Sequence, residues 1–113
     1  MSAAAREGGR LNPRVEKLRR MLDASPDDAF LLYALAMECK RDDAPKALEL
    51  LQRVIQLEPL HSYAYFQLGQ VHESAGRTDE AREIYQQGMT AAARAGDEHA
   101  RSELAGALNA LGD

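Results

Sequence analysis

The sequence repeats itself at an interval of 33 to 34 residues. One series of matched positions is followed by a second series of similar residues at the same spacing. The two series are Leu32, Leu35, Ala36, Cys39, Ala47, Leu51 and Pro59, and then Tyr65, Leu68, Gly69, His72, Ala81, Tyr85 and Ala93. This interval is typical of helix-turn-helix units that stack, because a single unit cannot bury its own apolar face. Such stacks usually bind other proteins, so the repeat indicates a class of activity.

Apolar periodicity and helix-ending residues predict six helices joined by short turns. Asn12 and Pro13 form a clear helix start, and Gly76 and Gly96 stand where helices end. The expected helices run from 12 to about 24, 27–40, 45–58, 62–74, 78–94 and 97–111. No segment alternates with period two for long enough to form a strand. The sequence therefore predicts an all-α fold of stacked, antiparallel helix pairs.

Small residues stand where two helices of such a pair must cross closely. These positions are Ala36, Ala47, Gly69, Ala81 and Gly88. A glycine inside a helix costs about 1 kcal/mol relative to alanine. We therefore expect Gly69 and Gly88 to lie at contacts where a side chain would push the helices apart.

The chain from about Pro13 to Leu111 resembles the tetratricopeptide repeat family. Tyr65, the pair 68–69, Ala81 and Tyr85 match the family pattern, whereas His72, Gly88 and Ala93 replace its Tyr, Ala and Pro. The earlier unit matches less well, and its turn is one residue shorter. The resemblance implies a right-handed superhelix in a single domain over 12–113. Its parts would be a half-repeat helix at 12–25, repeats at 27–60 and 61–95, and a C-terminal capping helix at 97–111.

In this family the first helices of successive repeats line a concave groove that accepts an extended or helical peptide. The resemblance, combined with helical spacing, implies which side chains face that groove. They are Tyr33, Met37 and Lys40, then Tyr63, Phe66, Gln67 and Gln70, and finally Arg101, with Phe30, Glu73 and Glu98 as further candidates. Four of the six aromatic residues fall on this face, and such rings are typical of binding hot spots. Phe30 has an alternative, in which the first helix or the tail covers it within the core.

Some family members grip a C-terminal carboxylate with Lys, Asn and Arg at fixed groove positions. The corresponding positions here hold Tyr33, Met37, Gln67, Glu98 and Ser102, none of which is basic. The resemblance therefore implies a ligand with apolar or aromatic anchors rather than an acidic tail.

The residues that could support catalysis or bind a metal are few and scattered. Cys39 occupies an apolar packing position, where a free cysteine behaves as a small hydrophobe. The pair 72–73 reads His-Glu as in a zinc-binding helix, but Gly76 stands where the second histidine would follow. Three histidines and one cysteine do not form a ligand set. We therefore expect no cofactor, no metal and no enzymatic activity.

Charge and composition bear on the partners and the compartment. The formal net charge is −4, although the first twenty residues hold six basic residues against two acidic ones. The overall acidity, and the lack of aromatic residues among those basic ones, argue against nucleic-acid binding. No apolar run approaches the ~20 residues of a membrane span. A single cysteine fits a reducing compartment, so we expect a cytoplasmic protein whose residues 1–11 form a flexible tail.

These observations favour a non-catalytic adaptor that binds a peptide segment of another protein in the concave groove. The first alternative is a self-associating structural module, a homodimer formed through an end helix. The apolar stripe of the first helix, at Val15, Leu18, Met21 and Leu22, motivates that alternative. A small enzyme is a remote alternative.

Overall fold

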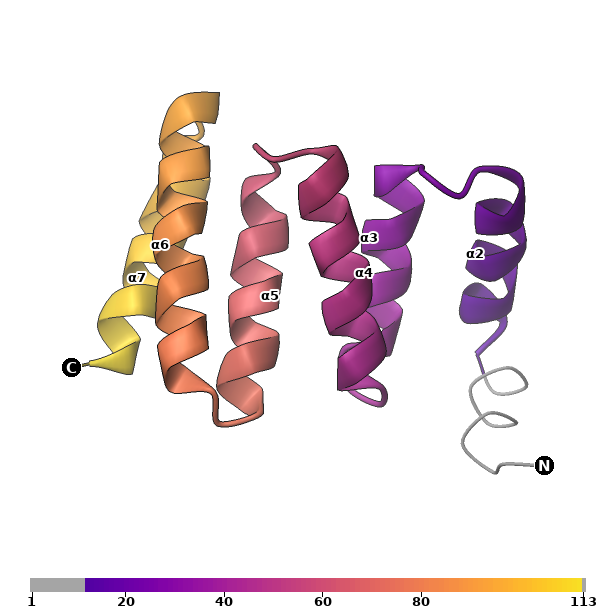
Figure 1. Ribbon diagram of the computed structural model, residues 1–113, viewed down its shortest axis with the longest axis horizontal. Helices are drawn as coiled ribbons and strands as arrows, with labels where there is room; N and C mark the ends of the chain where they lie inside the picture. The colour runs from indigo at the N-terminus through magenta and orange to yellow at the C-terminus, as the bar shows by residue number, and fades with distance from the viewer. Residues whose placement is uncertain (1–11, 113) are drawn as a thin grey trace.

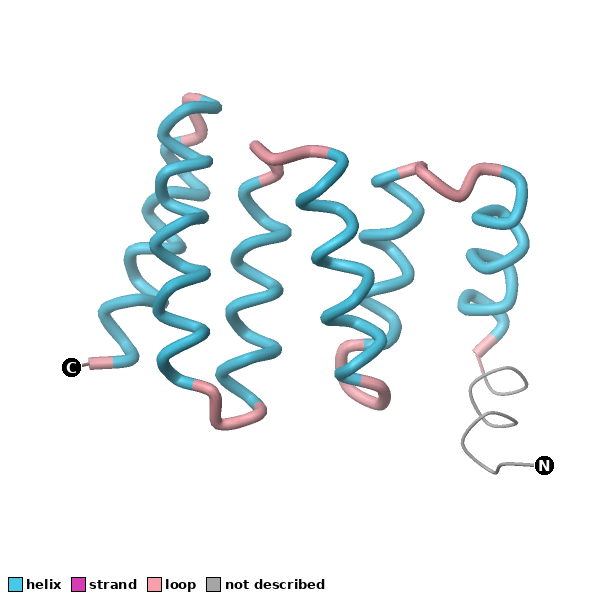
Figure 2. The backbone as a smooth tube through the Cα atoms, viewed as in Figure 1, coloured by secondary structure: helices cyan, strands magenta, loops and turns pink. Residues whose placement is uncertain are grey.

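The computed structural model describes residues 12–112, and within that range it contains six α-helices and no strand (Figures 1 and 2). The helices are α2 (Pro13–Ala24), α3 (Ala29–Cys39), α4 (Ala44–Leu57), α5 (Ser62–Ser74), α6 (Thr78–Ala95) and α7 (Glu98–Leu111). The all-α prediction is confirmed, and the helix ends lie within one or two residues of those expected. The expected tail at 1–11 lies outside the described residues.

Side-chain caps determine where most of the helices begin. Asn12, Asp28, Asp43 and Asp97 each accept a hydrogen bond from a backbone N–H in the first turn of the next helix, at 3.0 to 3.2 Å. The Nδ1 atom of His61 does the same for α5, accepting from the N–H of Ala64 at 3.1 Å. The first N–H groups of a helix have no partner within the helix, so each cap stabilises it by about 1 kcal/mol.

Three glycines with positive φ, Gly76, Gly96 and Gly112, follow the last three helices, and the first two end their helices in the same way. Gly76 has φ of 79° and Gly96 has φ of 70°, values that a residue with a Cβ rarely adopts. The residue after each glycine donates its N–H to a carbonyl five residues back, at 2.9 Å in both cases. This C-terminal capping arrangement reverses the chain within a few residues. Asp97 thus helps to end α6 with its backbone and starts α7 with its side chain.

The helices run alternately in opposite directions along an array whose extents are 43 × 29 × 18 Å (Figure 1). α3 packs against α4, α5 against α6 and α6 against α7, while α2 packs against α3 at one end. α3, α5 and α7 therefore run in the same direction. α5 contacts α7, and Lys40 of α3 is hydrogen-bonded to Gln70 of α5. These three helices form one face of the array, with α4 and α6 on the other.

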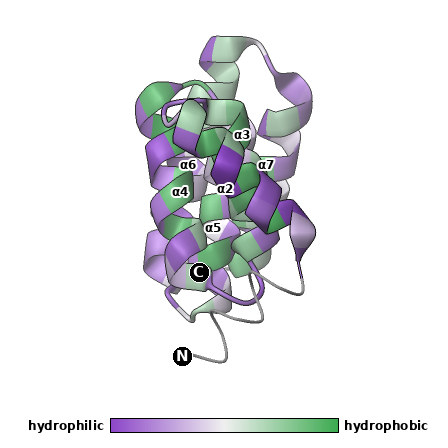
Figure 3. Cartoon of the chain, turned by 90° about the vertical axis from the view of Figure 1, so that its right-hand side faces the viewer, coloured by the Kyte–Doolittle hydropathy of each residue, from purple (hydrophilic) through white to green (hydrophobic). Residues whose placement is uncertain are grey.

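The core consists of two clusters of buried side chains. The first joins α2, α3, α4 and α5 around Leu51 and Val54, and the second joins α5, α6 and α7 around Tyr85 and Leu104. Ile55 of α4 and Ile84 of α6 pack against both clusters. In the end-on view of Figure 3, α2 is largely hydrophilic and green apolar segments mark α3. Each cluster excludes water only because neighbouring pairs stack.

The two helix-interior glycines lie at the closest contacts, as expected. A Cβ on Gly69 of α5 would collide with the buried ring of Tyr85 on α6. A Cβ on Gly88 of α6 would lie 2.7 Å from Cβ of Tyr65 and 2.9 Å from Cδ2 of Leu104. These separations are shorter than van der Waals contact, so the absence of a side chain sets how closely α5 and α7 approach α6.

We predict that Gly69→Ala destabilises the protein because the Tyr85 ring is fully buried and cannot move aside. Overpacking of this kind costs about 1–3 kcal/mol, and each kcal/mol lowers Tm by about 4–8 °C in a domain of this size. Thermal unfolding followed by circular dichroism measures the change. Gly106→Ala is the matched control: Gly106 lies within α7 with nothing near its Cβ position, so alanine should stabilise by up to about 1 kcal/mol. Equal melting of the two variants would contradict the close contact.

Candidate functional site

Seven of the eight residues expected in a groove lie on α3 and α5, and all seven are half-buried. Each set follows helical spacing, so its members share one side of their helix. They are Tyr33 and Met37 of α3 with Lys40 at its C-cap, and Tyr63, Phe66, Gln67 and Gln70 of α5. We refer to the surface that these residues form as the α3–α5 face.

Lys40 joins the two helices of the α3–α5 face. Its Nζ donates hydrogen bonds to Oε1 of Gln67 and, at 2.9 Å, to Oε1 of Gln70. Burial lowers the pKa of Lys40, because water no longer solvates the ammonium fully. The two amides take over part of that solvation, so the charge of Lys40 is already engaged within the chain.

Aromatic packing holds two rings of this surface in place. The ring of Tyr33 lies against that of His61, with centroids 4.9 Å apart and planes 30° apart. Phe66 lies against Tyr85, with centroids 6.2 Å apart and planes 42° apart. Burial raises the pKa of Tyr33, although its hydrogen bond with Gln67 acts in the opposite direction. Rings held in this way lose little entropy when a ligand contacts them.

A hollow of about 340 Å³ opens between α5 and α7, and we call it the α5–α7 hollow. The residues that line it are Phe66, Gln70, Glu73, Tyr85, Glu103, Ala107 and Ala110. Glu103 was not foreseen from the sequence. Together with Ala107 and Ala110 it follows i, i+4, i+7 spacing, which places all three on one flank of the buried stripe of α7. That spacing is the signal that could have identified them.

Arg101, the expected groove residue of α7, does not line this hollow. It is exposed, and its Nε pairs with Oε2 of Glu98 at 2.8 Å. Arg101 lies two positions before Glu103 in the sequence, and an offset of two positions corresponds to a rotation of about 200° around a helix. Arg101 and Glu98 therefore pair on a different side of α7.

A buried hydroxyl positions one carboxylate of the α5–α7 hollow. Tyr85 Oη donates a hydrogen bond to Oε1 of Glu73 at 2.8 Å. Burial, the hydrogen bond to Glu73 and the negative charge of that carboxylate together raise the pKa of Tyr85. The hydroxyl therefore stays protonated and keeps Glu73 at the hollow. Burial first, and then the carboxylates of Glu103 and Asp97, raise the pKa of Tyr63 at the other end of α5.

We predict that the free energy of unfolding falls as the pH rises above about 10, and that Tyr85→Phe makes this fall shallower. Unfolding returns Tyr85 to its ordinary pKa of 10.0, so above that pH the unfolded chain binds fewer protons than the folded chain. The contribution of Tyr85 to the free energy of unfolding is fully present below pH 10. Above pH 10 it is lost by up to about 1.4 kcal/mol per pH unit for one group. Urea unfolding between pH 8 and 11.5 measures this dependence. Parallel curves for the two proteins would contradict the assignment.

Phe30 lies at the first turn of α3 with 79% of its surface exposed. The first helix, α2, therefore does not cover Phe30, and the other part of that alternative, cover by the tail, lies outside the described residues. Phe30 has the exposure of a surface residue, and its position is one turn before Tyr33, on the same side of α3.

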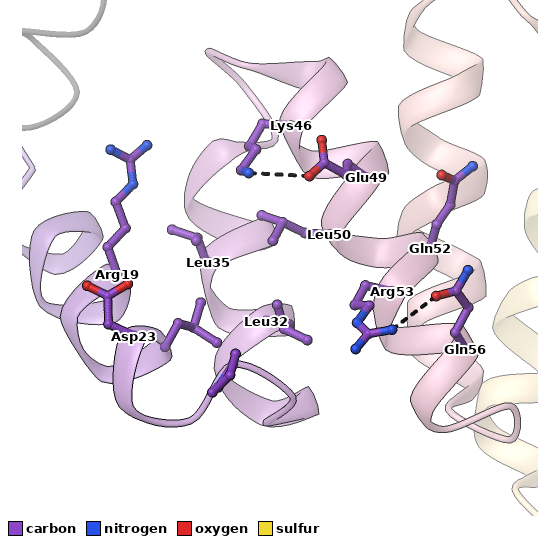
Figure 4. Close-up of a pocket in the computed structure, with 12 residues that line it drawn as sticks. Arg19, Asp23, Leu32, Leu35, Lys46, Glu49, Leu50, Gln52, Arg53 and Gln56 are labelled. Atoms are coloured by element: carbon purple, nitrogen blue, oxygen red, sulfur yellow. Dashed lines mark hydrogen bonds and ion pairs between the residues drawn. The ribbon is translucent and has the colours of Figure 1, made fainter.

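A second hollow, of about 770 Å³, separates α2 from α4 (Figure 4). Leu22, Leu32, Leu35 and Leu50 form its apolar part, and polar residues of α2 and α4 surround them. Two of these polar residues are already paired, since Lys46 Nζ lies 3.4 Å from Oε1 of Glu49. The sequence predicted Leu22, Leu32 and Leu35 as apolar packing residues, whereas the burial of Leu50 was not predicted. The sequence could not show that α2 and α4 stay apart and leave a hollow over the leucines of α3.

The described residues show no grouping of metal-ligating side chains. Over residues 12–112, no three His, Cys, Asp or Glu side chains are placed to hold one metal ion. Cys39 is buried, and that burial raises the pKa of its thiol. A thiol with a raised pKa is a poor nucleophile, because the thiolate is the reactive form. Among the described helices, none is both long and apolar enough to cross a bilayer.

The arrangement of parallel first helices, close glycine contacts and a half-buried aromatic face defines a helical-repeat protein. Comparison with known proteins identifies which kind. The tetratricopeptide repeat model matches residues 40–102, which is more than half of the chain. The chain belongs to the tetratricopeptide repeat family.

Relatives in three bacteria support this assignment. A TPR repeat-containing protein of Pseudomonas aeruginosa is 34% identical over 80% of this chain and 87% of its own length. The solution structure of a tetratricopeptide repeat domain protein from Salinibacter ruber has a TM-score of 0.72 at 36% identity, covering 77% of this chain and 89% of that one. A protein from Bordetella parapertussis has a TM-score of 0.76 at 28% identity, covering 86% and 85%.

Proposed function

We propose that this chain is a non-catalytic adaptor that binds a peptide segment of a partner protein on its α3–α5 face. Proteins of this family generally bind other proteins, and their fold is typically non-catalytic. The half-buried rings and amides of the α3–α5 face are the observation that carries the proposal. We place the protein in the cytoplasm, where a lone buried cysteine stays reduced.

The α3–α5 face offers both parts of a peptide site. Tyr33 and Phe66 are packed against other rings and present apolar surface without needing to become ordered. Gln67 and Gln70 are held by Lys40, and an amide side chain can hydrogen-bond both the N–H and the C=O of an extended backbone. The rings favour a segment with apolar or aromatic anchors, on which tight interfaces depend, and the amides favour an extended backbone.

A random library of 12-residue peptides, displayed on phage and selected against the folded protein, tests this proposal. Backbone amides of α3 and α5 should shift in NMR spectra when a selected peptide is added, while those of α4 and α6 stay near their positions. We predict that Phe66→Ala weakens the peptide by at least ~30-fold, as expected for an anchoring contact of ~2 kcal/mol. Fluorescence anisotropy measures the affinity.

Met21→Ala is the matched control, because Met21 is a large apolar residue that is 44% exposed on the end helix α2. It should bind the peptide within about twofold of the wild type. Circular dichroism first shows that both variants fold. Failure to select any peptide, together with a stable dimer in light scattering that Met21→Ala disrupts, would instead support self-association through α2.

A further inference from the structure

The α5–α7 hollow combines an aromatic wall, two carboxylates and unfilled space. Phe66 and the hydroxyl end of Tyr85 lie on the α5–α6 side, and Glu73 and Glu103 approach from α5 and α7. Ala107 and Ala110 line the α7 side. Because these alanines carry only methyl groups, a hollow of about 340 Å³ stays open where longer side chains would fill it.

The described residues compensate the negative charge of this hollow only in part. Glu73 accepts a hydrogen bond from Tyr85 and, over residues 12–112, takes part in no ion pair. Glu103 pairs only with His99, at 2.7 Å, and that pair is ionic only when the imidazole is protonated. Lys40 lies beside the hollow, since its Nζ donates to Oε1 of Gln70, and its positive charge offsets one of the two carboxylates. Arg101 pairs with Glu98 on another side of α7. Two carboxylates at one opening, neither of them in an ion pair with a described lysine or arginine, favour a positively charged guest.

We propose that the α5–α7 hollow binds an arginine side chain of the partner segment. This inference rests on the proposed peptide-binding function, and it adds a specific requirement to the apolar anchors. A guanidinium can stack its flat face on the ring of Phe66 while its N–H groups donate to the carboxylate of Glu73, and Glu103 adds a second negative charge at the same opening. The hydroxyl of Tyr85 holds Glu73 in place, so little ordering is needed when the guest enters.

Arginine fits this hollow better than lysine for geometric reasons. Its guanidinium is planar and carries five donors, so it can stack on an aromatic ring and donate to a carboxylate at the same time. A lysine ammonium is a compact, strongly hydrated charge that must lose more water to do so. The hollow should therefore distinguish the two cations, although both carry one positive charge.

The direct test uses N-acetyl-arginine amide as the probe, with N-acetyl-citrulline amide as its neutral isostere. NMR titration should show saturable shifts of the amides of Phe66, Gln70 and Ala107 with the arginine compound. The citrulline compound should cause no saturable shift. Glu73→Gln should weaken arginine binding at least ~10-fold because it removes a charged acceptor, and Glu103→Gln should weaken binding by a smaller factor because it removes a negative charge at the opening.

The variants are chosen so that folding and charge can be separated. Glu73→Gln keeps an oxygen that can accept the hydrogen bond from Tyr85, so the protein should fold as before. Glu83→Gln removes one carboxylate from the exposed surface of α6 and should bind the probe like the wild type. Ala107→Leu fills the hollow without changing charge and should also abolish the shifts.

Equal shifts with arginine and citrulline, unchanged binding by Glu73→Gln, or no shift at all would each overturn the inference. Selected peptides separate it from the proposed function. Peptides that bind the α3–α5 face equally well with citrulline in place of arginine would leave the adaptor function standing and refute the arginine site. Probe binding in the hollow, with no peptide bound, would support the site and refute the adaptor function.

Discussion

The contact between Gly69 and Tyr85 is the interaction on which the rest of the structure depends. Tyr85 is fully buried, and its ring lies directly against the backbone of α5 where Gly69 lacks a side chain. The same ring packs against Phe66, and its hydroxyl holds Glu73. One side chain of α6 therefore sets the distance between two helices and also positions two residues of the candidate site. Stability and binding geometry are coupled at this residue.

The fold could be predicted from the sequence because its determinants are local or periodic. Asn12 and Pro13 mark a helix start by their own chemistry, and Gly76 and Gly96 mark helix ends. The 33- to 34-residue repeat then requires helix pairs to stack, and Gly69 indicates where they touch. These features need no knowledge of residues far away in the chain.

The candidate site was less predictable because it depends on the relative rotation of separate helices. Helical spacing identified the residues of α3 and α5, since each matched helix supplies its own register. On α7, Arg101 pairs with Glu98, and Glu103, which the spacing had not singled out, lines the α5–α7 hollow. The exposure of Phe30 and the gap between α2 and α4 likewise follow from how whole helices pack. Neither is encoded in a short stretch of sequence.

The division of the core into two clusters has a mechanical consequence. Ile55 and Ile84 pack against both clusters, so they lie at a joint within the array. Tyr33 and Met37 pack on the first cluster, and Tyr63 and Phe66 pack on the second. A segment bound along α3 and α5 would contact side chains that pack on both clusters. Its binding free energy would then stabilise the packing of one cluster against the other. A segment bound along both helices would therefore resist separation of the two clusters.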